Sequence, residues 1–318
     1  MARRVSVVIP TFNRKGVLAR AIKGYLAQSA IDEIKEVLVV DDGSTDGTDR
    51  VVSAMASEAP FPLRRLYQSN RGQAAARNRG ISEARAEIIL FTDDDIVPTP
   101  HLLAEHLRWH DQHAEREAAV IGYVEWSPEL HPTPFMKWIG LDGPLFAYGS
   151  IRGKVEVDGF LYFYTCNLSL KTELLRQAGT FDEDFAGYGW EDIELGYRLR
   201  KSGMRLFYNP AALAYHYKRI TFAEACRREE KVALAWRVFE QKEAGQALLA
   251  YHAEQQAAEA RRRRSALNRA IDLLPGWIKS SIVSPFRLLL DTPIPLPWRV
   301  YRKFYFEALA KLNRSQPR

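Results

Sequence analysis

Short apolar segments alternate with helical patterns in the first hundred residues, and this alternation restricts the fold more than any other feature of the sequence. Strands are expected at residues 5–9, 36–40, 63–67 and 88–91; the last of these, for example, is too short for a helix and contains β-branched and aromatic residues. Helices are expected between them, at residues 15–28, 45–55 and 73–84. Strand and helix in strict alternation predict an α/β fold with a doubly wound, mostly parallel sheet and right-handed crossovers.

Each of these predicted strands ends in small or polar residues. The side chains at the four strand ends are Pro10, Thr11 and Asn13, then Asp41 and Asp42, then residues 68–72, then Thr92 with Asp93, Asp94 and Asp95. In an open α/β sheet, ligands bind in the crevice outside the carboxyl ends of the strands. We therefore expect the four groups to line one crevice.

The three consecutive aspartates, Asp93 to Asp95, carry the strongest chemical signal. Like charges at the end of a buried strand repel one another and lose hydration, and a cation offsets both costs. Mg²⁺ takes one or two carboxylates together with substrate phosphates, and Mn²⁺ also favours oxygen ligands. A solvated acidic turn is the alternative, but the three other polar strand ends favour a metal that carries a phosphorylated ligand.

Two further positions before residue 100 have both a structural and a functional interpretation. Asp42 lies in the sequence DDGSTDG, whose residues form turns and cap helices. Its side chain is also a candidate for binding the substrate. Arg77 lies one turn into the third predicted helix. It is either a surface charge or a bidentate clamp on a phosphate.

The second half of the chain has a looser pattern. A helix is expected from Thr99-Pro100 to about residue 109, and further helices at 171–178 and 191–203. Strands are expected at 120–125, 161–170, 205–208 and 211–215. Residues 126–160 are rich in Pro, Gly and aromatic residues, which suits acceptor contacts or a lid.

Three ionisable residues of this half are candidates for the chemistry. Glu191 and Asp192 open the helix at 191–203 after a loop containing Gly and Trp. The helix dipole favours carboxylates there, but one of the pair could also act as a general base. His216 follows the last predicted strand, and is either a core or surface residue or a third protein ligand of the ion.

Taken together, the motifs resemble glycosyltransferase family 2, whose members have the nucleotide-sugar-binding GT-A fold. The matching segments are VSVVIPTFNR, VLVVDDGSTDGT, NRGQAAARNRGI, FTDDD, GTFDEDF and GWEDIELGYRLRKSG, and they occur in the family's order. The resemblance covers about residues 4–216. It implies a catalytic domain at 1–216, with a nucleotide-sugar half at about 1–100 and an acceptor half at about 120–216.

The resemblance also implies roles for individual residues. Nucleotide-sugar binding falls on Pro10, Thr11, Asn13, Asp42, Arg77, Asp93 and Asp94. Within that set, Thr11 and Asp42 correspond to positions that hold the nucleobase and ribose, and Asp94 to one facing the ribose or donor sugar. Metal binding falls on Asp93, Asp95 and His216. The general base corresponds to Asp192, with Glu191 beside it.

The implied function is a metal-dependent inverting glycosyltransferase that uses Mg²⁺ or Mn²⁺. Its donor would be a nucleoside-diphosphate sugar and its acceptor a glycan or lipid-linked hydroxyl, as in cell-surface polysaccharide synthesis. One alternative is a catalytically silent nucleotide-sugar-binding or scaffold protein. Another is a nucleotidyltransferase, although TFNRKG is a poor match to the glycine-rich basic loop of that class.

The C-terminal third, residues 217–318, is expected to form a basic helical extension. It holds 20 Lys and Arg against 10 Asp and Glu, a net charge of +10, whereas residues 1–216 carry −4. A capping box at Thr221 and Glu224 predicts a long helix to about residue 259, with a weak point at Gly245. Beyond the four arginines at 261–264, prolines interrupt aromatic and basic segments at 271–278 and 296–306.

These segments suit contact with a membrane surface, packing on the catalytic domain, or a subunit contact. No nucleic-acid-binding motif accompanies the basic residues, so no nucleic-acid partner is expected. The two cysteines have no CxxC spacing, and the N-terminus lacks a signal-peptide core. No apolar stretch is long enough to span a membrane. We therefore expect a cytoplasmic protein, peripheral on the inner face of the membrane if the extension binds lipid.

Overall fold

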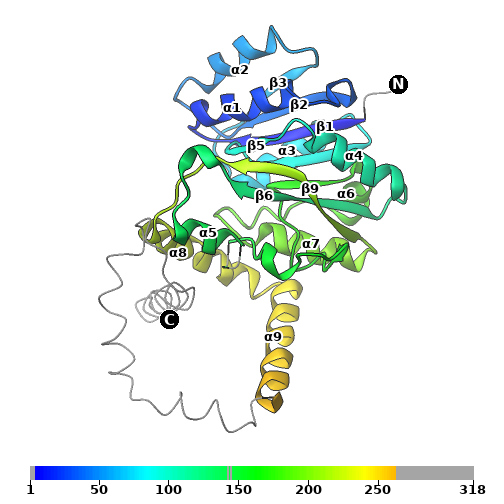
Figure 1. Ribbon diagram of the computed structural model, residues 1–318, viewed down its shortest axis with the longest axis vertical. Coiled ribbons are helices and arrows are strands. Elements are labelled where there is room, and N and C mark those ends of the chain that lie inside the picture. Colours follow the sequence, from blue (N-terminus) through cyan, green and yellow to red (C-terminus); the bar gives the residue numbers. More distant parts are fainter. Residues whose placement is uncertain (1–3, 142, 144, 263–318) are drawn as a thin grey trace.

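The alternation predicted for the first hundred residues is present in the structure. The computed structural model describes residues 4–262 of the 318, except 142 and 144 (Figure 1). The first elements are β1 (Val5–Thr11), α1 (Lys15–Leu26), β2 (Ile34–Asp41), α2 (Thr48–Ala56), β3 (Leu63–Tyr67), α3 (Gln73–Glu83) and β4 (Ile88–Thr92). A 3₁₀ turn, η1 (Ile31–Glu33), precedes β2. These boundaries confirm the predicted strands and helices to within three residues.

The later elements are more varied. They are β5 (Ile96–Pro98), α4 (Leu102–Gln112), β6 (Ala118–Trp126), α5 (Pro134–Leu141), β7 (Glu156–Val157), β8 (Asn167–Lys171), α6 (Thr172–Ala178), α7 (Glu191–Lys201), β9 (Arg205–His216), α8 (Phe222–Phe239) and α9 (Glu243–Arg262). Two further 3₁₀ turns are η2 (Pro128–Leu130) and η3 (Tyr148–Ser150). The segment at 126–160 therefore contains a helix and short turns rather than one long irregular loop.

One sheet runs through the molecule in the order β3-β2-β1-β4-β8-β6-β9-β5, with β7 pairing with β9. Strands β1 to β4 pair in parallel. The connection from β3 to β4 returns past β2 and β1 through α3. With right-handed crossovers, this reversal puts α3 on the opposite face of the sheet from α1 and α2, which makes the sheet doubly wound.

The topology gathers the ends of distant strands at one edge of the sheet. Strand β8 runs antiparallel to both β4 and β6, so Asn167, at the start of β8, lies opposite Thr92 at the end of β4. Strands β6 and β9 are parallel, and their last residues, Trp126 and His216, pair with each other. The switch point between β1 and β4, where the order reverses, is the usual ligand position in such sheets.

Several predicted boundaries were wrong, for identifiable reasons. The strand expected at 161–170 starts only at Asn167, because backbone hydrogen bonds to Asp158 close turns before it. The two strands expected at 205–208 and 211–215 form one strand, β9. It accommodates Pro210 in a bulge, where the partner of Gly122 is Asn209 and the partner of the next residue is already Leu213.

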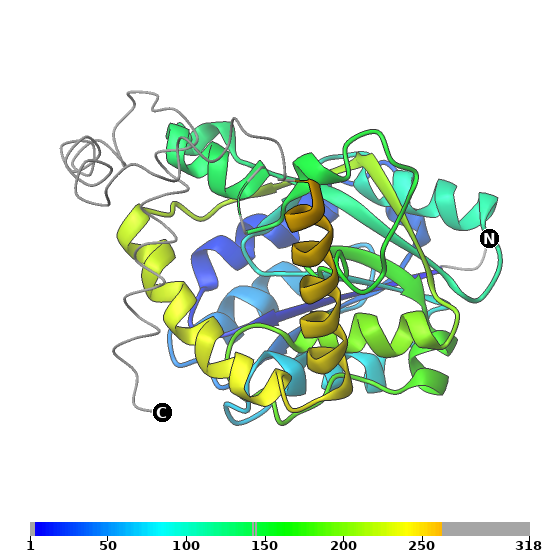
Figure 2. The ribbon, with the colours of Figure 1, turned by 90° about the horizontal axis from the view of Figure 1, so that it is seen from below.

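The helices after residue 99 also differ from the prediction. Helix α4 begins at Leu102 and is preceded by His101, so Pro100 lies outside it. The capping box at Thr221 and Glu224 is confirmed, with both of its hydrogen bonds formed. The long helix that follows is split at residues 240–242 into α8 and α9, which meet at an elbow (Figure 2).

Helix α8 packs on the earlier part of the chain through two apolar clusters. Phe222 and Ala225 join Trp126 and Phe135 in one cluster. Ala235 and Phe239 join a second cluster, which contains Phe160 and Phe185. Within residues 4–262, no helix has the length and apolar character needed to cross a membrane. The segments at 271–278 and 296–306 lie outside the described residues.

Candidate active site

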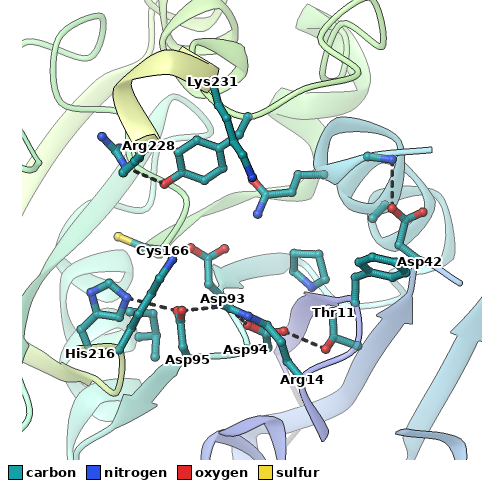
Figure 3. Close-up of a pocket in the computed structure, with 18 of the residues that line it drawn as sticks. Thr11, Arg14, Asp42, Asp93, Asp94, Asp95, Cys166, His216, Arg228 and Lys231 are labelled. Atoms are coloured by element: carbon teal, nitrogen blue, oxygen red, sulfur yellow. Dashed lines mark hydrogen bonds and ion pairs between the residues drawn. The ribbon is translucent and has the colours of Figure 1, made fainter. Parts of the chain in front are cut away.

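A cavity of about 430 Å³ opens at the edge of the sheet where the strand ends gather. Its walls come from the residues that follow β1, β2 and β4, from the start of β8, from the end of β9 and from α8 (Figure 3). Asp42 and Thr11 lie on one side of the cavity, and His216 and Cys166 on the other. The convergence of strand ends predicted from the sequence is confirmed.

The three aspartates that follow β4 have different partners. Asp94 accepts hydrogen bonds from Thr11 Oγ1 and Arg14 Nη1, each at 2.7 Å. Asp95 accepts one from the same Arg14 nitrogen at 2.8 Å, and its Oδ1 lies 3.3 Å from His216 Nε2. Asp93 turns toward Arg77, 3.0 Å away. The Thr11–Asp94 bond spans the switch point between β1 and β4.

These environments separate the acidities of two adjacent carboxyl groups. Burial raises the pKa of Asp94 to about 6, although Arg14 opposes the change. Burial would also raise the pKa of Asp95, but His216 and Arg14 more than offset it and hold that pKa below its usual range. Asp95 is therefore an anion at neutral pH and Asp94 is partly protonated near pH 6, which suits different roles for the two.

The buried side chain of Arg77 forms ion pairs with acidic residues from two parts of the chain. Its guanidinium donates to Asp93 at 3.0 Å and to Glu191 at 2.9 Å, and lies 3.5 Å from Asp192. The Arg77 side chain is 3 % exposed and is not among the residues that line the cavity. The structure thus places it behind the cavity wall, bonded to carboxylates.

Two hydrogen bonds from Thr165 hold the carboxylate of Asp192. Its carboxylate accepts hydrogen bonds from the backbone nitrogen of Thr165 at 3.1 Å and from the Thr165 hydroxyl at 2.9 Å. Burial raises the pKa of Asp192 to about 7; Arg77 lowers it and Glu191 raises it. The Asp192 side chain is 21 % exposed, whereas that of Glu191 is 5 % exposed. Asp192 is the member of the pair that solvent, and hence a substrate hydroxyl, can reach.

A strained residue immediately precedes this pair. Trp190 has a φ angle of +72°, a left-handed conformation that is costly for a large side chain. Helix α8 holds it there: the indole donates to the carbonyl of Val232 at 3.1 Å and stacks on Phe239 with ring centres 4.7 Å apart. The start of α7, and with it the direction of Asp192, therefore depends on α8.

The other predicted residues lie at or just after the carboxyl ends of β1 and β2. Pro10, Thr11 and Asp42 line the cavity. The Asp42 carboxylate accepts from the backbone nitrogens of Arg71 and Gly72, both at 2.9 Å, so it also shapes the loop before α3. Asn13 is not among the lining residues. It has a φ angle of +54°, and its side-chain oxygen accepts from the Thr45 backbone.

Four cationic residues of the cavity were missed by the sequence reasoning. They are Arg14, Lys218, Arg228 and Lys231. The last three lie beyond residue 216, where the catalytic domain was expected to end. Burial lowers the pKa of Lys218, opposed by Asp95. The basic excess after residue 216 was the available signal, but it did not indicate which basic residues face the cavity.

The side chains that line the cavity include the kinds of oxygen and nitrogen atoms that bind a divalent ion. Asp93, Asp95 and His216 all line it, and carboxylate oxygen with imidazole nitrogen is a combination that Mn²⁺ accepts. The buried Nδ1 of His216 has no hydrogen-bond partner among the described residues. As the side chains stand, however, no three His, Cys, Asp or Glu residues in the described part of the chain form a group that could hold a metal ion.

Two family profiles match the sequence. Glycosyl transferase family 2 matches residues 6–156, and Glycosyl transferase family group 2 matches residues 88–306. The second match covers more than half of the chain and extends past α8. The cavity lies within the combined range.

Curated relatives agree with these profiles. Validoxylamine A glucosyltransferase from Streptomyces hygroscopicus subsp. limoneus is 35% identical over 222 residues, which cover 63% of this chain and 48% of that protein. Chondroitin synthase from Escherichia coli is 28% identical over 241 residues, covering 67% and 34% respectively. The chain spans about half the length of the first of these relatives.

Solved structures share the fold. The mannosyltransferase PcManGT from Pyrobaculum calidifontis, in complex with GDP-Man and Mn²⁺, aligns with a TM-score of 0.64 at 23% identity, covering 99% of this chain and 88% of that one. Residues 1–349 of TarS from S. aureus align with a TM-score of 0.56 at 16% identity, covering 98% and 90%. The predicted α/β fold of the GT-A type is confirmed.

Proposed function

The chain belongs to glycosyltransferase family 2, and we propose that it transfers a sugar from a nucleoside-diphosphate sugar to an acceptor hydroxyl. One observation carries the proposal. A single cavity has three aspartates on one wall and Arg228 and Lys231 on the opposite wall, and Lys218, whose charge acts on Asp95, also lines it. A diphosphate needs cationic partners, and its leaving oxygen must be stabilised as the sugar departs.

The donor would lie across the switch point of the sheet. In this proposal Pro10, Thr11 and Asp42 face the nucleoside, and the diphosphate lies between Asp93–Asp95 and the cations of the opposite wall. Asp94, bonded to Thr11, faces the ribose or the donor sugar. Asn13 holds the loop after β2 by its bond to Thr45. Arg77 acts as a positioning residue, since its three ionic contacts are carboxylates.

Transfer would proceed by a single displacement with inversion. The acceptor oxygen forms a bond to the anomeric carbon, the bond from that carbon to the phosphate oxygen breaks, and the acceptor proton passes to Asp192. The pKa of Asp192, raised by burial to about 7, suits a general base at neutral pH. Glu191 orients Arg77 and so helps to position that base.

The residues that would hold a divalent ion are Asp93, Asp95 and His216. When bound, Mg²⁺ or Mn²⁺ would neutralise charge on the diphosphate. The Mn²⁺ in the mannosyltransferase structure supports this part of the proposal. Arg14, which now contacts Asp95, would exchange that contact for a phosphate oxygen.

The biological setting is proposed to be the synthesis of a cell-surface or lipid-linked glycan. Relatives named as chondroitin and hyaluronan synthases support a polysaccharide product. The basic excess of the C-terminal third supports peripheral contact with an anionic membrane surface.

A donor panel tests the function. The full chain is incubated with UDP-, GDP- and dTDP-sugars, and nucleoside diphosphate release is measured with Mn²⁺, with Mg²⁺ and with EDTA. Release from one donor, abolished by EDTA and restored by either ion, is the expected result. Release in EDTA equal to that with Mn²⁺ would refute the role of the metal.

The same panel tests for a silent protein, and a second incubation, with a nucleoside triphosphate and a sugar phosphate, tests for a nucleotidyltransferase. A scaffold or silent binding protein would release nothing from any donor. A nucleotidyltransferase would form a nucleotide sugar from a nucleoside triphosphate and a sugar phosphate, with release of pyrophosphate.

A further inference from the structure

A second cavity, of about 270 Å³, lies beside the first. Its walls come from the end of β6, from α5 and from the end of β9. Trp126, Phe146 and His216 line both cavities. The residues proposed to bind the donor otherwise line the first cavity alone, so the donor reaction assigns no role to the second.

The lining of the second cavity combines aromatic surface with free polar groups. Tyr123, Trp126 and Phe146 supply the aromatic surface. Glu125 and Lys137 supply opposite charges, and both side chains are exposed. Among the described residues, neither side chain has a hydrogen bond or an ion pair. The cavity thus offers apolar faces with two uncommitted polar groups.

The aromatic wall is held firmly. The Trp126 indole donates a hydrogen bond to the carbonyl of Met136 in α5 and stacks on His216, with ring centres 4.9 Å apart and planes 9° apart. Gly140 allows α5 to lie this close, because a Cβ there would be 2.7 Å from the indole nitrogen. A ligand would therefore meet a preformed surface, which lowers the entropic cost of binding.

The position of the second cavity relates it to the reaction. Its wall residue His216 lies 3.3 Å from Asp95. Another shared residue, Phe146, has its ring centre 6.0 Å from that of Tyr164, which immediately precedes Thr165, the residue that anchors Asp192. The two cavities therefore adjoin each other through shared residues that lie near Asp95 and near the anchor of Asp192.

We propose that the second cavity binds one sugar residue of the acceptor. A sugar ring has an apolar face of C–H groups and a rim of hydroxyls. The face suits Trp126 and Phe146, while Glu125 accepts hydrogen bonds from hydroxyls and Lys137 donates to sugar oxygens. The volume is close to the lower end of the range for small-molecule sites, about 300–1,000 Å³, and suits one ring better than a nucleotide. The inference rests on the proposed glycosyl transfer.

The test separates acceptor binding from donor chemistry. Glu125→Gln and Lys137→Met are compared with Glu58→Gln and Lys154→Met, which change exposed residues that line neither cavity. The probes are p-nitrophenyl glycosides of glucose, galactose and N-acetylglucosamine. Their binding to the full chain is followed by saturation-transfer NMR, and nucleoside diphosphate release is measured without acceptor.

We expect at least one glycoside to bind the wild type, and its dissociation constant to rise about tenfold in each cavity variant because one hydrogen bond to a charged group is lost. Donor release should be unchanged in all variants. Failure of every glycoside to bind, or equal binding by cavity and control variants, would overturn the inference while donor release still supports the transferase. Absence of donor release from the wild type would instead count against the proposed function.

Discussion

Burial raises the pKa of Asp192, and the charge of Arg77 lowers it. The resulting pKa is about 7, so at pH 7 half of the molecules carry the protonated form, which cannot act as a base. The group is a base only when deprotonated, so the transfer rate should rise with pH and level off above about 7. The measurement is kcat for transfer between about pH 5 and 9; a rate that falls as pH rises through 7 would contradict the role of base.

The Asp192→Asn variant tests the same residue without a change of pH. The amide cannot accept the acceptor proton, so transfer should fall by a factor of about 10² to 10⁴. Nucleotide affinity should stay near the wild-type value, because Asp192 is not among the residues lining the donor cavity. Turnover and nucleoside diphosphate binding are measured together. Wild-type turnover in this variant would exclude Asp192 as the base.

Arg77 is predicted to be the most sensitive basic residue for stability. Replacing it with Met leaves Asp93, Glu191 and Asp192 without their shared cation, and the free energy of unfolding should fall by about 3–5 kcal/mol. Denaturant unfolding measures the change. Arg79→Met, on the same helix with an exposed ion pair to Glu83, is the control and should cost at most about 1 kcal/mol. Equal effects of the two changes would contradict the central position of Arg77.

At the scale of elements, helix α8 serves two purposes. It brings Arg228 and Lys231 to the cavity wall opposite the aspartates (Figure 3). It also holds Trp190 in its strained conformation through Val232 and Phe239. One helix thus connects the diphosphate side of the site to the start of α7, which carries the proposed base.

The cationic face of α8 gives a prediction for binding. Lys231→Met should weaken nucleoside diphosphate binding about tenfold, because a charge-assisted contact to phosphate is lost. Arg227→Met is the matched control, since Arg227 is exposed on the same helix and does not line the cavity. Isothermal titration with UDP and GDP measures both. An unchanged dissociation constant in Lys231→Met would place the diphosphate elsewhere.

The elbow between α8 and α9 depends on a glycine. A Cβ at Gly245 would overlap the carbonyl oxygen of Phe239, which the backbone could not tolerate without moving. The sequence indicated a weak point at this glycine. The helix breaks at residues 240–242, just before this glycine. Gly245 then lies against Phe239, at a distance that only a residue without a side chain allows.

At the scale of the whole molecule, the packed unit that contains the cavity extends past residue 216, because α8 joins two of its apolar clusters and lines the cavity. A chain ended at residue 221 would lose Phe222, Ala225 and Phe239 from two apolar clusters. Since burying one large apolar side chain contributes about 1.5–3 kcal/mol, the loss should exceed several kcal/mol and lower the melting temperature. A chain ended at residue 262 keeps these contacts and should melt at a higher temperature than the chain ended at residue 221. Equal melting of the two shortened chains would show that α8 contributes little.

The remaining residues, 263–318, hold eleven Lys and Arg against three Asp and Glu. If they contact a membrane, the full chain should float with vesicles that contain anionic lipid, and the chain ended at residue 262 should not. Equal flotation of both chains would argue against contact through this segment.

The alternating strands and helices, the polar strand ends and the candidate acids could be predicted because each of these is a local pattern of a few residues. How they combine depends on contacts between residues far apart in the chain. The bond from Arg77 to Glu191 joins residues 114 positions apart, and no local periodicity encodes such a pair. The position of α8 likewise depends on apolar contacts with residues far away in the chain, such as Trp126 and Phe160. Packing of α8 therefore brings its cations to the site, although the excess of basic residues can be read from the sequence alone.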